Sequence, residues 1–329
     1  MRRPSSSFSL SGRAYRGVTL LAVVAVGVII VTGGAVRLTG SGLGCPDWPT
    51  CSRGSLVAAT SAHRAIESIN RTFTGLVSVA VVLAVLGSLF REGPRRRDLL
   101  WLSWGLVAGV VGQIVLGGLT VLFDLAPPLV MGHFLLSMAL LADAVVLHDR
   151  AGRPDPPVSV RPVVDVDTRR LGGLLVATTA LVVLLGTVVT AAGPHGGDEK
   201  AKRLDVPLHR AAQLHGAAVI LLLVMTVAMV WLIRRAGQPE EPTRRVSALL
   251  LVLVMQAAIG YTQYFSGVPA LLVGFHIAGA AAVWVAVLRL RLSLHHVVPD
   301  VARMETWAAS SRPSVSRQPR SASPRPTSS

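Results

Sequence analysis

The sequence predicts an all-α integral membrane protein with eight transmembrane helices, arranged as two parallel four-helix repeats. Of its 329 residues, 51% are hydrophobic and only 15% are charged, a balance typical of multi-span membrane proteins. Eight apolar runs are long enough to cross about 30 Å of hydrocarbon. The two halves of the chain also carry matching motifs at matching intervals, which indicates an internal repeat.

The apolar runs and the segments between them define the expected domain organisation. The expected spans are 17–37, 66–90, 99–123, 128–148, 171–192, 211–233, 246–266 and 268–290. They imply an N-terminal segment at 1–16, a first repeat at 17–148 with an outer loop at 38–61, a linker at 149–170, a second repeat at 171–291, and a disordered tail at 292–329.

Basic residues predict the orientation. If the N-terminus lies inside, the inner segments contain arginine clusters such as 95–97, 234–235 and 244–245. The outer loops then keep only Arg37, Arg53, Lys200, Lys202 and Arg203. This asymmetry places both termini, the linker and the tail in the cytoplasm. The net charge of +15 follows this topology, so we expect contact with membrane lipid and no nucleic-acid partner.

The first outer loop contains the only two cysteines of the chain, Cys45 and Cys51. The predicted orientation puts them on the oxidising face of the membrane, where two nearby cysteines normally pair. A structural disulfide is therefore expected, and free thiols or a redox-active pair are the alternatives.

The internal repeat is most evident in the spacing of polar residues. Gln113 precedes His133 by 20 residues, and Gln256 precedes His276 by the same interval. A His-Arg pair opens both the second and the sixth span. Because each unit contains an even number of helices, both copies insert in the same orientation, unlike the inverted repeats of many transporters.

The second span begins with an unusually polar face. His63, Glu67, Asn70 and Arg71 stand at i, i+4, i+7 and i+8 of one helix. A carboxylate at membrane depth costs roughly 2.5–3.5 kcal/mol, so Glu67 is a candidate functional residue. The alternative is that it only pairs with Arg71 one turn on. The second repeat has no acid at the matching place, which suggests that only the first half needs one.

Three histidines near the outer ends of the fourth, sixth and eighth spans predict haem sites. Two facing helices that each offer an imidazole form a bis-histidine haem site in a four-helix bundle. The second half offers His215 and His276, and the first half offers His133 opposite Asn70. Zinc or copper would need three or four close ligands, which neither half supplies.

Together these motifs resemble the bacterial, eight-span haem A synthase family over nearly the whole chain except the tail. The resemblance rests on the loop sequence TGSGLGCPDWP at 39–49, on Ile66-Glu67, and on the three histidines. It implies a plasma-membrane enzyme that oxidises a methyl group of haem O to the formyl group of haem A for cytochrome oxidase assembly. It also implies a substrate haem in the first half and a haem b in the second.

The resemblance assigns roles to individual residues. Glu67 matches the acidic residue of catalysis, and Cys45 and Cys51 match the outer-loop disulfide pair. His133 matches an axial ligand of the first-half haem, and His215 and His276 match the ligands of haem b. A haem O-producing farnesyltransferase is the expected neighbour by analogy. An electron donor and a homo-oligomer are further partners to consider.

One position departs from the family pattern. The commoner pattern is Glu-x-x-His-Arg, whereas this chain reads Glu67-Ser-Ile-Asn70-Arg71. An amide oxygen is a poor ligand for haem iron, so our hypothesis is that His133 alone holds the first-half iron. The alternative is that another residue moves in. His63 is no easy substitute, since seven residues span about 10 Å of helix.

Two other classes of function fit parts of the pattern. A non-catalytic di-haem b electron carrier would keep the histidines without needing Glu67 or the cysteine loop. A small-molecule transporter would use Glu67 as a proton relay and would bind no haem.

Overall fold

A computed structural model describes residues 9–45, 48, 62–155, 158–199, 201–237 and 239–299 of the chain. Within these residues, eight α-helices are long and apolar enough to cross a membrane, which confirms the predicted helical membrane protein. They are α1 (Gly12–Leu38), α2 (Ala62–Phe90), α3 (Arg97–Leu122), α4 (Pro127–Ala151), α5 (Val166–Ala192), α6 (Leu208–Arg235), α7 (Glu240–Phe265) and α8 (Ala270–Ser293).

The helices extend beyond the apolar runs at their polar ends. For example, α1 begins at Gly12, five residues before the expected span, because Ser11 caps it by accepting a hydrogen bond from the Ala14 N–H. The first turns of α1 also contain Arg13 and Arg16. Arginine is tolerated at this position because its charged head can reach the membrane–water interface while the methylene part of its side chain stays in apolar surroundings.

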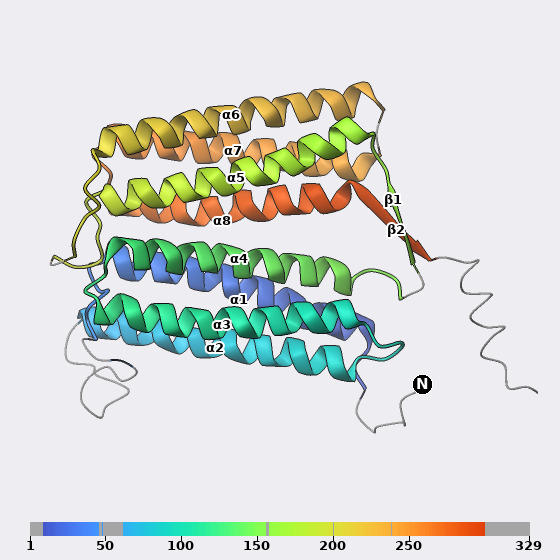
Figure 1. Ribbon diagram of the computed structural model, residues 1–329, viewed down its shortest axis with the longest axis horizontal. Helices are drawn as coiled ribbons and strands as arrows, with labels where there is room; N and C mark the ends of the chain where they lie inside the picture. Colours follow the sequence, from blue (N-terminus) through green and yellow to red (C-terminus); the bar gives the residue numbers. More distant parts are fainter. Residues whose placement is uncertain are drawn as a thin grey trace, which may run out of the picture.

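The eight helices form two groups of four (Figure 1). Within the first group, α1 contacts α2 and α4, and α3 contacts α2 and α4; α5 to α8 contact one another in the same ring. The groups meet where α1 packs on α8 and where α4 packs on α5 and α8. The helix connections after α1, α3, α5 and α7 gather at one end, and α1 begins and α8 ends at the other.

Polar contacts join the two groups at two levels. Near the middle of the interface, the indole N–H of Trp284 in α8 donates to the Met138 carbonyl of α4 at 2.9 Å. At the end of the bundle where α1 and α5 end, the Arg37 guanidinium donates to the carbonyls of Thr190 and His195 at 2.7 and 2.6 Å. Each of these bonds satisfies a backbone carbonyl, so the two groups of helices are fixed relative to one another at both levels.

A small antiparallel sheet lies at the opposite end of the bundle (Figure 1). Strand β1 (Val158–Pro162) pairs with β2 (His295–Pro299), and Val160 faces Val297. The strands fall in segments that we expected to be a linker and a disordered tail. Their β-branched valines suit an extended backbone, and the pairing lets each strand satisfy backbone groups of the other.

Two glycines of α2 provide a test of this packing. Gly87 is buried, and a methyl group added there would lie 2.6 Å from a ring carbon of the fully buried Tyr15. We expect Gly87→Ala to lower the free energy of unfolding by about 1–3 kcal/mol because the core is overpacked. Gly75→Ala is the matched control, since nothing lies within 4 Å of its added methyl group. Thermal unfolding of the full chain in detergent measures both, and equal stability of the two variants would contradict the packing described here.

Candidate functional site

The structure brings His215 of α6 and His276 of α8 together inside the second group of helices. Their ring centroids are 6.3 Å apart and the ring planes are inclined by 71°. Bonds from a metal to imidazole nitrogens are about 2 Å long, so two rings on opposite sides of one metal have centroids about 6 Å apart. The pair therefore has the separation that a single iron between the two rings requires.

Hydrogen bonding prepares His215 to act as a ligand. Its Nδ1 lies 3.1 Å from the Val182 carbonyl of α5, and a carbonyl can only accept, so Nδ1 carries the proton. This leaves the lone pair on Nε2, the atom that binds a metal. Within the described residues, no hydrogen bond occupies Nε2 of His215 or of His276, and the buried Nδ1 of His276 has no partner.

Each of these histidines packs against a glycine of the preceding helix. A methyl group added to Gly186 would lie 3.2 Å from Cε1 of His215, and one on Gly260 would lie 3.0 Å from Cε1 of His276. The close approach holds each ring against backbone. A larger side chain would have to displace the imidazole, so the glycines determine where the rings lie.

The third histidine, His133 of α4, has the same surroundings as His276. A methyl group on Gly117 would lie 3.3 Å from its Cε1, and its buried Nδ1 also lacks a partner among the described residues. The Gln113 amide donates to the His133 carbonyl at 3.0 Å, as Gln256 does to the His276 carbonyl at 2.7 Å. The sequence interval thus corresponds to a repeated contact between neighbouring helices.

Asn70 is already engaged by another side chain. The Thr32 hydroxyl of α1 donates to Asn70 Oδ1 at 2.9 Å. An amide oxygen has two lone pairs, and the Thr32 hydroxyl uses one of them. This hydrogen bond fixes the orientation of the Asn70 amide against α1.

Glu67 is buried and fully paired. The residue is 5% exposed; its Oε1 accepts from the Arg71 guanidinium at 2.6 Å, and its Oε2 accepts from the Cys45 N–H at 2.7 Å. The helical ion pair that the sequence offered as an alternative role is therefore present. In addition, the carboxylate fixes the start of the loop after α1 to α2, which the sequence did not predict.

Further contacts join the loop after α1 to α2 and α3. His63 Nδ1 lies 3.0 Å from the Ser41 hydroxyl, so His63 contacts the loop. Trp48 packs on α3, where a methyl group on Gly118 would lie 2.7 Å from its ring. Cys45 is fully buried, whereas Cys51 lies outside the described residues, so the expected disulfide stays a prediction.

Sequence reasoning missed several residues of the site. Thr32 gave no signal, because a threonine near a helix end is common and its partner lies on another helix. The glycines opposite the histidines could have been found from the sequence, since Gly117 and Gly260 each follow a glutamine by four residues. The acid Asp143 of α4 lies against Gly105 of α3, where an added methyl group would be 2.6 Å from its Oδ2.

These features define a class of protein: an integral membrane bundle whose interior histidines suit ligation of a haem iron. The sequence profile of the cytochrome oxidase assembly protein family matches residues 16–67 and 57–194, more than half of the chain. The chain belongs to this family.

Three relatives with similar sequences are all named Heme A synthase. A Heme A synthase of Shewanella oneidensis is 23% identical over 322 residues, which cover 84% of this chain and 96% of that protein. A Heme A synthase of Halalkalibacterium halodurans is 24% identical over 75% of this chain and 83% of its own length. A third, from Bacillus licheniformis, is 28% identical over 136 residues, and this alignment spans 44% of the relative's length.

The ion pair of Glu67 provides a stability test. The Glu67 side chain is 7% exposed and that of Arg71 is 27% exposed. Removing one partner of a buried pair leaves the other charge poorly compensated, so we expect Glu67→Ala to lower the free energy of unfolding by about 3 kcal/mol. Unfolding of the full chain in detergent measures the change.

Glu241 supplies the matched control. It pairs with Arg244 and Arg245, but it is 45% exposed. An exposed pair contributes about 0–1 kcal/mol, so Glu241→Ala should lose far less stability. Equal losses for the two variants would mean that the Glu67–Arg71 pair does not hold the N-terminal end of α2.

Proposed function

We propose that the chain is a haem A synthase, a membrane oxidoreductase that oxidises one methyl group of haem O to the formyl group of haem A for cytochrome oxidase biogenesis. Family membership and three relatives of this name support the assignment. The structural observation that carries it is the His215–His276 pair, whose 6.3 Å separation suits one iron.

The second half would hold a haem b. His215 and His276 would hold it, since their rings lie 6.3 Å apart on helices α6 and α8 inside the second group. When bound, this group supplies one-electron redox chemistry. The protein's part is to fix the ligands: Val182 sets the tautomer of His215, and Gly186 and Gly260 set the ring positions.

The first half would hold the substrate haem through His133. Its surroundings match those of His276, which supports the same role. Asn70 is a poor candidate for a second ligand, because an amide oxygen binds haem iron weakly and Thr32 holds the amide against α1. We therefore expect His133 to be the one residue of this half that would hold the iron.

Glu67 is the proposed catalytic residue. Oxidation of a methyl carbon removes electrons and protons, and positive charge develops near that carbon as electrons leave. The two hydrogen-bonded oxygens of Glu67 keep a carboxylate in a fixed place. A fixed carboxylate can stabilise such charge and receive a proton without reorganising.

The proposal also includes the repeat, the membrane orientation and the partners of the protein. We infer that the two groups of helices are parallel repeats, supported by the recurring Gln-to-His contact of α3/α4 and α7/α8. Arginine distribution supports cytoplasmic termini. A haem O-producing farnesyltransferase would supply the substrate, and a separate donor or acceptor would exchange electrons with the enzyme.

Pigment extraction from the purified protein tests the proposed function. We expect haem b together with haem O or haem A in the intact protein. In Glu67→Gln, which keeps an oxygen to accept from Cys45, we expect haem binding to persist and haem A yield to fall about a hundredfold or more. Glu241→Gln is the control and should leave the yield unchanged.

Other pigments would support other functions. Haem b alone would indicate the electron carrier, and absence of pigment would indicate the transporter. A normal haem A yield from Glu67→Gln would remove Glu67 from catalysis while leaving the enzyme assignment in place.

The ligation of the first-half iron is tested by electron paramagnetic resonance of the purified, haem-loaded protein. We expect one low-spin bis-histidine signal from the second half and a high-spin signal from the first. Asn70→His should convert the high-spin signal to low-spin by adding a second imidazole, and Asn70→Ala should leave it high-spin. Two low-spin bis-histidine signals in the unaltered protein would contradict single-histidine ligation.

A further inference from the structure

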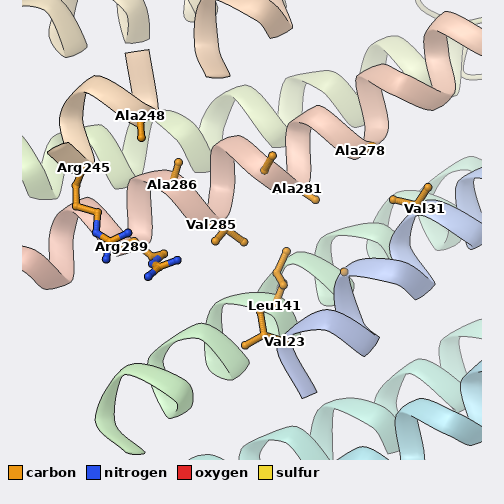
Figure 2. A pocket seen from close by; sticks show the side chains of 12 residues that line it. Val23, Val31, Leu141, Arg245, Ala248, Ala278, Ala281, Val285, Ala286 and Arg289 are labelled. Atoms are coloured by element: carbon orange, nitrogen blue, oxygen red, sulfur yellow. The ribbon is translucent and has the colours of Figure 1, made fainter. Parts of the chain in front are cut away.

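A groove of about 420 Å³ lies between the two groups of helices, and none of the described residues that line it is a histidine. Figure 2 shows that α1 lines one wall and α7 and α8 the other, with Leu141 of α4 at its base. Half of the lining residues are glycine or alanine, among them Gly27, Ala278 and Ala282. Small residues leave room at a helix interface that would otherwise be closed by side chains.

One end of the groove is strongly basic. Arg245 of α7 and Arg289 of α8 both line it, and their guanidinium groups lie near each other in Figure 2. Arg245 is paired with Glu241, which also pairs with Arg244. Arg289, in contrast, makes no hydrogen bond or ion pair within the described part of the chain.

The acids near Arg289 do not neutralise it. Electrostatic influence on Arg289 comes from Glu241 and Asp149. Glu241 already serves two arginines, and Asp149 is paired with Arg153. The basic end therefore has an excess of positive charge and can accept an anionic group.

The length of the groove matches one lipid leaflet. Ala278 and Arg289 are eleven residues apart on α8, which corresponds to about 16 Å of helix. One leaflet contributes half of a hydrocarbon core about 30 Å thick. An acyl chain can thus lie along the small residues while its headgroup reaches the arginines at the end where α1 begins and α8 ends.

We propose that this groove binds one anionic phospholipid, with its phosphate at Arg245 and Arg289 and an acyl chain along Gly27, Ala278 and Ala282. Basic pockets between transmembrane helices bind anionic headgroups in this way. The lipid fills a gap at the interface of the two halves, so it also acts as a packing element. The proposal does not depend on the reaction that the protein catalyses.

Lipid retention by the full-length protein tests the proposal. The protein is reconstituted in nanodiscs of equal phosphatidylglycerol and phosphatidylcholine, transferred to detergent, and analysed by native mass spectrometry. We expect one phosphatidylglycerol to be retained in preference to phosphatidylcholine. One arginine near a membrane surface increases the preference for an anionic lipid roughly fivefold. Arg289→Gln should therefore reduce the preference for phosphatidylglycerol over phosphatidylcholine about fivefold, and the Arg245→Gln/Arg289→Gln variant should reduce it further.

Two matched controls separate this site from general effects. Arg170→Gln removes a charge at the same end, but its side chain is 74% exposed outside the groove, so retention should not change. Ala282→Phe fills the groove and should abolish retention, whereas Ala177→Phe on the exposed face of α5 should not. Haem content and thermal unfolding confirm that each variant is folded.

Four outcomes would overturn the proposal: equal retention of the two lipids, unchanged preference in the double arginine variant, unchanged retention in Ala282→Phe, or displacement of the lipid by free inorganic phosphate. A stable dimer whose cross-links map to the groove would assign it to a second copy of the chain instead.

Discussion

The site depends on close approach between each histidine and the backbone of the helix before it. Apolar helices in lipid gain nothing from hydrophobic burial against one another, so van der Waals packing between small residues must hold them together. Glycine at positions 117, 186 and 260 allows this contact in the pairs α3/α4, α5/α6 and α7/α8. The same contact also fixes the imidazole ring that packs on the glycine. The glycine is therefore needed both for the association of the two helices and for the position of the histidine ring.

The pair α1/α2 breaks this pattern, and its departures concentrate in one place. A threonine–asparagine hydrogen bond replaces the glycine–histidine contact. One turn earlier in α2, Glu67 joins Arg71 to the loop after α1 through Cys45. Two repeats that only carried electrons, as in the alternative function, would have no need for such a difference. The asymmetry supports our proposal that one half binds a fixed redox group and the other a group that reacts.

The sequence predicted the parts of the molecule that depend on local composition. Apolar runs located all eight helices, and the interval from glutamine to histidine located a contact that recurs, because both are short-range patterns. Contacts between distant segments left no such pattern. The bond from Trp284 to the Met138 carbonyl joins the two groups of helices, and the pairing of Val160 with Val297 joins the predicted linker to the predicted tail. The ends of several helices also differ from the ends of the expected spans, because helices continue through arginines that lie outside the apolar runs.

The interface between the halves also connects the two candidate sites. His276 is followed by Ile277, whose side chain packs on Gly34 of α1, where an added methyl group would lie 3.0 Å away. Gly34 is two residues from Thr32, which holds Asn70. One connection between the second-half histidines and the first-half site therefore crosses a single contact, that of the Ile277 side chain on Gly34. A larger residue at position 34 would separate α1 from α8 there, so the glycine that lets the helices meet also keeps the two sites within a few residues of one another.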